Sequence, residues 1–144
     1  DSGDGYSYLH DKLSLCAAEQ SPDVLVSFGE RGAKTPQDET EASYCRKITK
    51  EEGRIDFKSE KAAHIINKMR AYEIWPGCYF ILDGKRMKLL KATVTEQKIS
   101  PGEVLIIEGK MMIGTKEKSL EIKKIQPESK RAMSTEEFLR GQKL

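Results

Sequence analysis

The sequence contains no long run of apolar residues and few cysteines, and both shortages limit what the protein can be. The roughly 18 to 20 apolar residues of a membrane-spanning helix occur nowhere, and no signal-peptide pattern opens the 144-residue chain. The three cysteines, at positions 16, 45 and 78, are odd in number and form no C-x-x-C pair, which argues against a disulfide framework and a zinc site. We therefore expect reduced cysteines, no membrane segment, no metal and a cytoplasmic location.

Motifs that carry catalysis are also missing. The sequence has two histidines, His10 and His64, and neither belongs to a metal-binding pattern such as H-E-x-x-H. It has no G-x-S-x-G motif, phosphate-binding loop or dinucleotide-binding fingerprint. The cysteines have no histidine partner nearby in the sequence, so a thiol nucleophile is unsupported. We expect no catalytic residue and no cofactor site in this chain.

Aromatic residues are absent between Lys85 and Ile125. Barrels that read nucleic-acid bases usually present aromatic side chains as stacking platforms. Four aromatic residues lie just before this stretch, and we expect them to pack in the core: Tyr72, Trp75, Tyr79 and Phe80. A nucleic-acid partner would then be held by lysine and arginine, which contact phosphates and carry no direct sequence information.

Positive charge is present, but it is unevenly distributed. Residues 1–45 carry three basic and nine acidic groups, a net of −6, whereas residues 46–144 carry 22 basic and 14 acidic groups, a net of +8. Such a basic half favours a polyanionic partner, although many soluble proteins also have a solvated lysine-rich surface.

The first part of the chain predicts two short helices. Apolar residues from Leu9 to Ala17 recur at helical spacing, and Pro22 is expected to interrupt the helix. A second helix would begin at Ser21 as its N-cap and end at Gly29 or Gly32. Two such helices cannot enclose a core, so their apolar faces need a partner.

From residue 59 onward the pattern predicts a helix and then a small sheet. Ser59 is a suitable N-cap for a helix whose apolar residues share one face: Ala62, Ile65, Ile66, Met69 and Tyr72. Five strands follow, at 78–82, 86–94, 103–108, 111–114 and 119–125, with Asp83-Gly84 as a hairpin turn. Within 86–94 the apolar residues change from odd to even positions, which predicts a β-bulge: Met87 and Leu89 come first, then Leu90, Ala92 and Val94. A capping box at 134–137 predicts a short last helix.

The predicted fold class is therefore mainly β with flanking helices. Five short strands separated by turn residues favour a small barrel of the oligonucleotide-binding (OB) type. Basic residues at the turns and strand ends of this barrel form the candidate RNA-binding site: Lys85, Arg86, Lys88, Lys91, Lys123, Lys124, Lys130 and Arg131. Lys110, Lys116 and Lys118 mark other turns of the same basic half. The alternative is that these lysines protect exposed strands from aggregation. The scarcity of acidic residues between Lys85 and Lys98 favours the binding site.

Several segments resemble the bacterial methionyl-tRNA formyltransferase family. In order they are PQDETEASY, KITKEEGRIDF, RAYEIWPGCYF, DGKRMKLLKATV and QPESKRAMSTEEFLRGQKL. The likeness covers about residues 36–144, and LHDKL extends it toward the N-terminus. The tail KRAMSTEEFLRG is typical of this family rather than of other formyltetrahydrofolate-using enzymes that share the barrel.

The resemblance implies a division of the chain. Residues 1–35 would be the terminal helical segment of an α/β catalytic domain, residues 36–58 a polar interdomain linker, and residues 59–144 the C-terminal OB-like tRNA-binding domain. It also implies that the linker contacts tRNA phosphates through Lys47, Lys50 and Arg54.

The resemblance further implies an activity of the parent enzyme, which would transfer a formyl group from 10-formyltetrahydrofolate to the amino group of initiator methionyl-tRNA. The partners of this portion would be that tRNA and the upstream catalytic domain of the same polypeptide. The catalytic residues of the family lie upstream, so we expect this portion alone to be inactive.

Two alternatives remain open. The chain could be a stand-alone nucleic-acid-binding OB-like module with a helical arm, or the matching domain of another formyltetrahydrofolate-using enzyme. The apolar residues of the first segment discriminate, because a self-sufficient module would bury them: Leu9, Leu13, Val24, Leu25 and Phe28.

Overall fold

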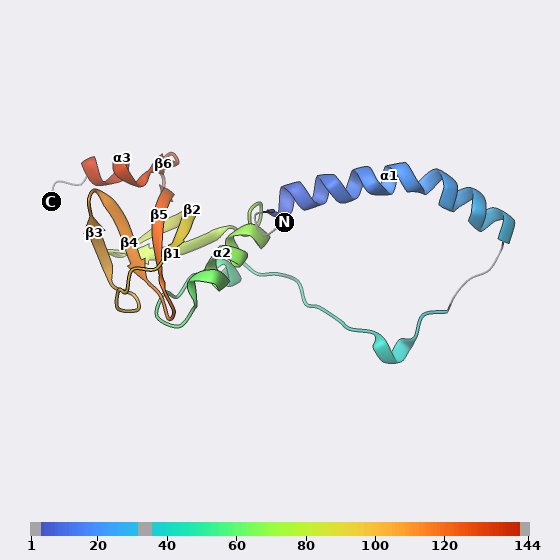
Figure 1. Cartoon of the computed structure of the whole chain (residues 1–144), viewed down its shortest axis with the longest axis horizontal. Coiled ribbons are helices and arrows are strands. Elements are labelled where there is room, and N and C mark those ends of the chain that lie inside the picture. The colour runs from blue at the N-terminus through green and yellow to red at the C-terminus, as the bar shows by residue number, and fades with distance from the viewer. Residues whose placement is uncertain (1–3, 32–35, 142–144) are drawn as a thin grey trace. The chain divides into compact units, whose positions relative to one another are not determined.

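The protein divides into two units, Asp1–Ile48 and Thr49–Leu144, in a computed structural model that describes residues 4–31 and 36–141. The elements of both units are labelled in Figure 1. The first unit holds a long helix, α1 (Tyr6–Arg31), and a 3-10 turn, η1 (Glu39–Glu41). The second unit holds all the described strands and the two shorter α-helices.

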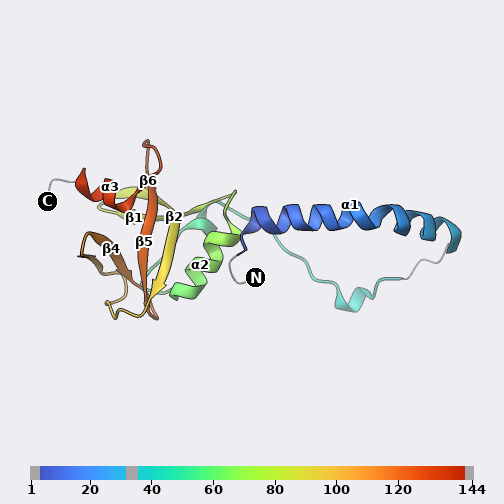
Figure 2. The same cartoon turned by 45° about the horizontal axis from the view of Figure 1, so that its top comes forward.

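Helix α1 is continuous over 26 residues, so the predicted break at Pro22 is wrong. Figure 2 shows it as one helix from a second direction. A proline inside a helix removes one backbone hydrogen bond, and here the hydroxyl of Ser21 donates to the carbonyl of Ala17 in the preceding turn. Ser21 is thus an interior residue rather than an N-cap. The helix also passes Gly29, while Gly32 lies outside the described residues.

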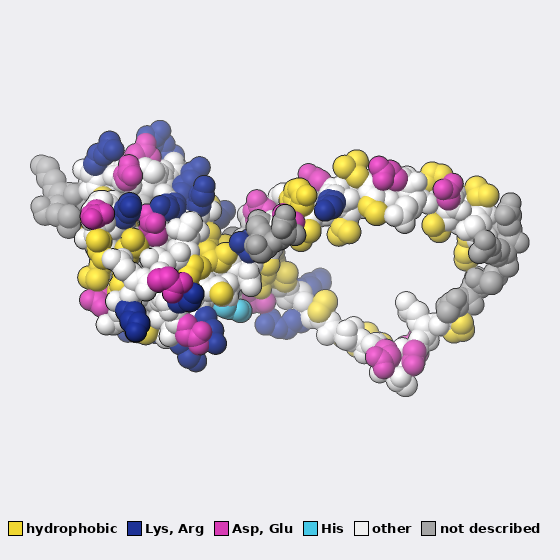
Figure 3. All heavy atoms as spheres, viewed as in Figure 1, with side chains coloured by type: hydrophobic (Ala, Val, Ile, Leu, Met, Phe, Trp, Pro, Cys, Tyr) yellow, Lys and Arg dark blue, Asp and Glu magenta, His cyan; other side chains and the backbone are white. Residues whose placement is uncertain are grey.

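The apolar side chains of α1 are exposed. Leu13 has 68% and Leu25 has 70% of its surface exposed, and the other predicted stripe residues are also classed as exposed: Leu9, Val24 and Phe28. Figure 3 shows hydrophobic side chains along more than one side of this helix. No described helix has both the length and the apolarity needed to cross a bilayer.

The second unit is built on one antiparallel sheet. Its strands are β1 (Cys78–Leu82), β2 (Lys85–Thr95), β3 (Val104–Ile107), β4 (Lys110–Gly114), β5 (Ser119–Pro127) and β6 (Met133–Ser134). The pairing order is β1-β2-β5-β4-β3, and β6 pairs with β5. The mainly β fold with flanking helices is confirmed, but the sequence missed the two-residue β6. The pairing order has β1 and β3 at its two ends, so closure of the sheet into a barrel stays a prediction.

The predicted bulge in the second strand is confirmed. The register of β2 against β5 shifts between Leu89 and Lys91 and again between Lys91 and Ala92. An extra residue on one strand of an antiparallel pair bends that strand and increases its twist. This lets Met87 and Leu89, before the shift, and Ala92, after it, all pack in or against the same core.

Helix α2 (Ala62–Ala71) presents the predicted apolar face, but it begins later than predicted. Ala62 and Ile65 are buried, and Ile66, Met69 and Tyr72 pack against the core. The N-cap is Lys61, without a side-chain cap hydrogen bond. The Ser59 hydroxyl instead donates to the carboxylate of Asp56, which lies in the turn before the helix.

Residues 49–58, which the sequence assigns to the linker, pack into the second unit. A 3-10 turn, η2 (Glu51–Gly53), precedes Arg54, which forms a parallel bridge with Tyr79. Ile55 and Phe57 are buried core residues, and the ring of Phe57 meets that of Phe80 edge-on at 5.2 Å. Alternation of apolar and polar residues in GRIDF places one side of this segment against the sheet.

The short last helix, α3 (Thr135–Arg140), is present as predicted. Ser134 and Glu137 form the expected capping box, and Gly141 is the C-cap. Phe138 is buried against the core, and the hydroxyl of Thr135 donates to the carbonyl of Ile122 at 2.6 Å. Helix α3 therefore packs against β5 and the core.

Candidate nucleic-acid interface

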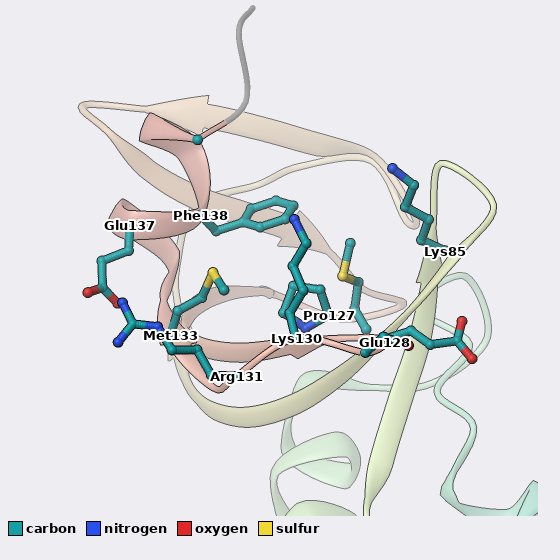
Figure 4. A pocket seen from close by; sticks show the side chains of 11 residues that line it. Lys85, Pro127, Glu128, Lys130, Arg131, Met133, Glu137 and Phe138 are labelled. Atoms are coloured by element: carbon teal, nitrogen blue, oxygen red, sulfur yellow. The ribbon is translucent and has the colours of Figure 1, made fainter.

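Five of the predicted basic residues surround the turn that follows β5. The first of two hollows there has a volume of about 820 Å³ and is lined by β2, the turn and α3. Figure 4 shows Lys85 coming from β2, and Lys130 and Arg131 from the segment after the turn. Met87, Met133 and Phe138 supply apolar walls. The hollow thus combines an apolar interior with three cationic side chains.

The second hollow lies on the other side of the same turn. It has a volume of about 300 Å³, and its cationic residues are Arg86 and Lys88. Both hollows include Pro127, Glu128 and Ser129 in their linings. Successive side chains of a strand point to opposite faces, so Lys85 serves the first hollow while Arg86 and Lys88 serve the second.

The shared turn is held in place by backbone hydrogen bonds. The N–H of Glu128 donates to the carbonyl of Arg86 at 3.0 Å, and the N–H of Lys130 donates to the carbonyl of Pro127 at 3.1 Å. The side-chain amide of Gln126 donates to the carbonyl of Lys130 at 3.0 Å. Ser129 has a positive φ of 60°. These contacts fix the spacing of the basic residues on either side of the turn.

Arg86 lies over an aromatic ring, which sequence reasoning missed. Its guanidinium carbon is 3.7 Å from the centre of the Tyr79 ring, a cation–π geometry. The prediction that the aromatic cluster packs in the core holds for Phe80, which is buried, and for Tyr72, which packs against the core. It does not hold for Trp75, which is 50% exposed, or for Tyr79, which is only partly buried. The hairpin register was the available signal for this contact. It pairs Tyr79 with Lys88, so Arg86, two residues earlier on β2, is a diagonal neighbour of Tyr79 on the same face.

The remaining basic residues of the sheet lie farther along β2 and β5. Lys91 and Lys124 are register partners, and like charges directly opposite one another destabilise a sheet unless they are screened. Lys123 forms an ion pair with Glu121 on its own strand. Lys124 also faces Ser134 of β6 in the register. These three lysines are absent from the linings of both hollows.

The predicted linker residues are divided between the two units. Lys47 belongs to the first unit, whereas Lys50 and Arg54 belong to the second. The carbonyl of Arg54 accepts a hydrogen bond from the Lys68 ammonium at 2.6 Å, and the N–H of Ile55 donates to the carbonyl of Tyr79. Arg54 is therefore next to β1, and the structure does not join Lys47 to this group.

The basic surface also contains acidic groups. Glu128 and Glu137 line the first hollow, and Glu137 accepts a hydrogen bond from the N–H of Ser134. Figure 3 shows Lys and Arg side chains over the second unit with Asp and Glu between them. The first hollow therefore has a smaller net positive charge than its three cationic side chains alone would give. Anion binding here depends on how the basic residues are grouped around the turn.

Reactive groups within the described residues are few. Burial raises the pKa of the Cys78 thiol to about 11, the nearby Lys68 opposing and Glu60 adding to the shift, so this thiol is protonated at neutral pH. His10 contacts Asp11, and both are exposed, whereas His64 is exposed but contacts the largely buried carboxylate of Glu60. Across residues 4–31 and 36–141, no group of three or more His, Cys, Asp or Glu side chains is placed to hold a metal ion.

Comparisons with known proteins agree with the fold. A family model described as "Formyl transferase, C-terminal domain" matches residues 47–143. A solved structure of HypX from Aquifex aeolicus aligns with a TM-score of 0.69 at 23% identity, covering 98% of this chain and 26% of that one, which shows a shared fold. A second HypX structure, in complex with tetrahydrofolic acid, aligns with a TM-score of 0.60 at 26% identity, covering 84% and 22%.

The curated relatives are more similar in sequence. The methionyl-tRNA formyltransferase of Nitratiruptor sp. is 39% identical over 137 residues, and that of Caldanaerobacter subterraneus is 41% identical over 137 residues. These alignments cover 94% and 92% of this chain but 44% of each relative. The protein therefore belongs to the formyl transferase family, and it corresponds to the C-terminal portion of methionyl-tRNA formyltransferases. The chain spans less than half the length of these relatives.

Proposed function

We propose that this chain is the tRNA-positioning portion of a methionyl-tRNA formyltransferase. The observation that carries the proposal is the grouping of five cationic side chains around one turn: Lys85, Arg86, Lys88, Lys130 and Arg131. Phosphate oxygens bind such groups through charge and through the release of counterions. The curated relatives are named methionyl-tRNA formyltransferases, which supports methionyl-tRNA as the RNA that is held. The proposed role is therefore in translation initiation, in the cytoplasm.

The proposed contacts position the tRNA rather than read its sequence. The strands from Lys85 to Ile125 offer no aromatic stacking platform, and Arg86 covers one face of the Tyr79 ring at the second hollow. Phosphate contacts fix register without identifying bases. Binding should therefore fall steeply with salt and differ little between initiator and elongator tRNA. Lys91, Lys123 and Lys124 would extend the contact along the sheet, and Lys47, Lys50 and Arg54 would add to it from the preceding segment.

The chemistry of the parent enzyme would take place elsewhere in the polypeptide. The tRNA amino group would attack the formyl carbon of the co-substrate 10-formyltetrahydrofolate, and upstream polar groups would stabilise the developing oxyanion. Neither a catalytic residue nor a cofactor site is assigned to the present chain. Incubating it with methionylated initiator tRNA and 10-formyltetrahydrofolate should yield no formylmethionyl-tRNA, and any turnover would show that a catalytic set is present.

We also propose that residues 1–35 end the catalytic domain and that the polar segment after them is the interdomain linker. The exposure of Leu13 and Leu25 supports this, because a stand-alone module would be expected to bury them. The structural likeness to HypX fits a related formyltetrahydrofolate-using enzyme in fold. The identities of 39% and 41% to methionyl-tRNA formyltransferases favour that family.

Replacing Lys85, Arg86 and Lys88 together by Ala tests the binding proposal. The affinity for tRNA should fall roughly tenfold or more at low salt, alike for initiator and elongator species, because charge-assisted contacts to phosphate are lost. The slope of log affinity against log salt should become shallower by about two to three, since each lost phosphate contact removes a little under one unit. Fluorescence anisotropy across a salt series measures both.

A matched control removes three positive charges away from the hollows. Lys98, Lys110 and Lys116 are exposed and line neither hollow. Their triple replacement by Ala changes the net charge equally and should weaken binding far less. If the two triple variants lost tRNA affinity equally, binding would depend on the overall positive charge and not on the residues around the turn. If the first triple variant lost binding to initiator tRNA alone, the proposal that these contacts do not distinguish between tRNAs would be wrong.

A further inference from the structure

Arg86 and Tyr79 form a cation–π pair at the second hollow. The guanidinium carbon lies 3.7 Å from the centre of the ring, and both residues line the hollow. Arginine stacks on aromatic faces while its five N–H donors remain available in the plane of the guanidinium. The ring therefore restricts the orientation of Arg86 and leaves its donor edge for an anion.

The side chain of Lys88 passes close to the backbone at the same hollow. A Cβ atom placed on Gly77 would lie 2.6 Å from Cε of Lys88, so the flexible end of the lysine side chain would have to move aside. Gly77 also has a φ of +75°, a conformation that glycine adopts without strain. Glycine at this position thus suits the backbone before β1, and the Lys88 side chain lies over it.

The remaining lining leaves the two cations free to bind an anion. Among the described residues, no acidic group forms an ion pair with Arg86 or Lys88. Glu128 is the one carboxylate in the lining, where Ser129 adds a hydroxyl group. Two cations and one carboxylate leave a net charge of about +1, and a volume of about 300 Å³ admits a small tetrahedral anion.

We infer that the second hollow is a site for a single phosphate group, with Arg86 and Lys88 as its ligands and Tyr79 as a positioning residue. Arginine supplies planar, bidentate donors and lysine supplies a compact charge. This inference rests on the proposed function for the source of the phosphate, a backbone phosphodiester of the bound tRNA. It goes further in that one contact is prearranged rather than formed by a mobile surface lysine.

A double-mutant cycle between Tyr79 and Arg86 tests the positioning role. Tyr79→Leu removes the ring, and we expect the affinity for tRNA to fall roughly two- to tenfold, as a cation–π contact of ordinary strength implies. Tyr79→Phe keeps the ring face and should bind within twofold of the original protein. In an Arg86→Ala background, Tyr79→Leu should have no further effect. An equal loss in both backgrounds would mean that Tyr79 acts through the fold, and it would overturn the inference.

A second measurement does not depend on tRNA. Inorganic phosphate at millimolar concentrations should shift the backbone amide resonances of Gly77, Glu128 and Ser129 in heteronuclear NMR spectra. Arg86→Ala and Lys88→Ala should each abolish most of the shift, whereas Lys98→Ala should leave it unchanged. Shifts spread evenly over the basic surface, or no shift at all, would exclude a built phosphate site.

The two measurements separate the inference from the proposed function. If tRNA does not bind but inorganic phosphate shifts these three amides, the phosphate site stands and the tRNA function fails. If tRNA binds while the phosphate shifts and the Tyr79–Arg86 coupling are both missing, the function stands and the phosphate site is refuted. Gly77→Ala is less suitable as a test, because the added Cβ strains the backbone as well as displacing Lys88.

Discussion

Leucine has opposite environments in the two units of this protein. Leu13 and Leu25 in α1 leave 68% and 70% of their surface exposed, whereas Leu120 in β5 leaves 0% exposed. The second unit gathers its apolar residues from the sheet, α2 and α3 into one core. The first unit has helical propensity without such a core. In proteins most helical stability comes from packing of an apolar face. We therefore expect the second unit to fold by itself and the first to need a partner surface.

The largest difference should appear when one leucine in each unit is shortened. Leu120→Ala should lower the free energy of unfolding by about 2–5 kcal/mol, because it removes buried methyl groups and leaves a cavity. Leu13→Ala, at an exposed position, should change it by less than about 0.5 kcal/mol. Urea unfolding followed by circular dichroism measures both. Similar losses in the two variants would mean that α1 is part of the same cooperative core.

The next effect concerns a carboxylate that ties the segment before α2 to that helix. Glu60 accepts a hydrogen bond from the N–H of Asp56 at 2.8 Å and pairs with Lys68 at 3.3 Å, and both side chains of this pair are 16% exposed. Glu60→Gln should destabilise the second unit by about 1–3 kcal/mol, since it leaves Lys68 without its countercharge.

Glu96→Gln is the matched control for that change. Glu96 pairs with Lys118, but its side chain is 81% exposed, and exposed ion pairs contribute about 0–1 kcal/mol. Equal effects of the two substitutions on the urea midpoint would contradict a structural role for Glu60.

A smaller effect should distinguish the helix caps of the two units. Ser134→Ala removes the capping box of α3 and should cost about 1 kcal/mol of the unfolding free energy. Asp38→Ala removes the cap of η1 in the first unit, where no core depends on it, and should leave the cooperative transition unchanged. If Asp38→Ala shifted that transition, η1 would have to unfold together with the core of the second unit.

The last effect appears only at alkaline pH, and it belongs to the second unit. Burial raises the pKa of Cys78 from 9.0 to about 11. The unfolded chain then loses this proton first, so stability is unaffected below about pH 9 and falls as the pH rises toward 11. Cys78→Ala should make this decline shallower in urea titrations from pH 8 to 11. Cys16→Ala, which removes an exposed thiol, should leave the decline as it is.

Much of the second unit could be predicted from the sequence, because its local signals agree with its packing. The bulge in β2 followed from an apolar parity that flips between Leu89 and Leu90, and the cap of α3 followed from Ser134 and Glu137. The start of α2 and the burial of Ile55 and Phe57 could not be predicted. Both depend on a segment that contacts the sheet across a long sequence separation, and charged neighbours conceal its apolar residues.

The basic residues of the candidate site could be predicted from the sequence, but the way they are brought together around two hollows could not. Strand alternation was available to separate Lys85 from Arg86 and Lys88, but the hollows also need the turn after β5 and α3, which come from distant parts of the sequence. Pro22 misled the prediction of α1, because the sequence alone does not show that a helix will continue past a proline. Tyr79 was misplaced because aromatic residues are more often found in a core.

The central claim is that residues 46–144 contain both the stable fold and the RNA-binding surface. This fragment retains every predicted basic contact residue, from Lys47 to Arg131. The most direct measurement compares the tRNA affinity of the fragment with that of the 144-residue chain by fluorescence anisotropy, over about 50 to 200 mM salt, where phosphate contacts are most salt-sensitive. The affinities should agree within about twofold, with the same salt slope, because α1 adds no phosphate contacts. A loss of tenfold or more in the fragment, at unchanged stability, would contradict the claim and assign RNA binding to the helical segment.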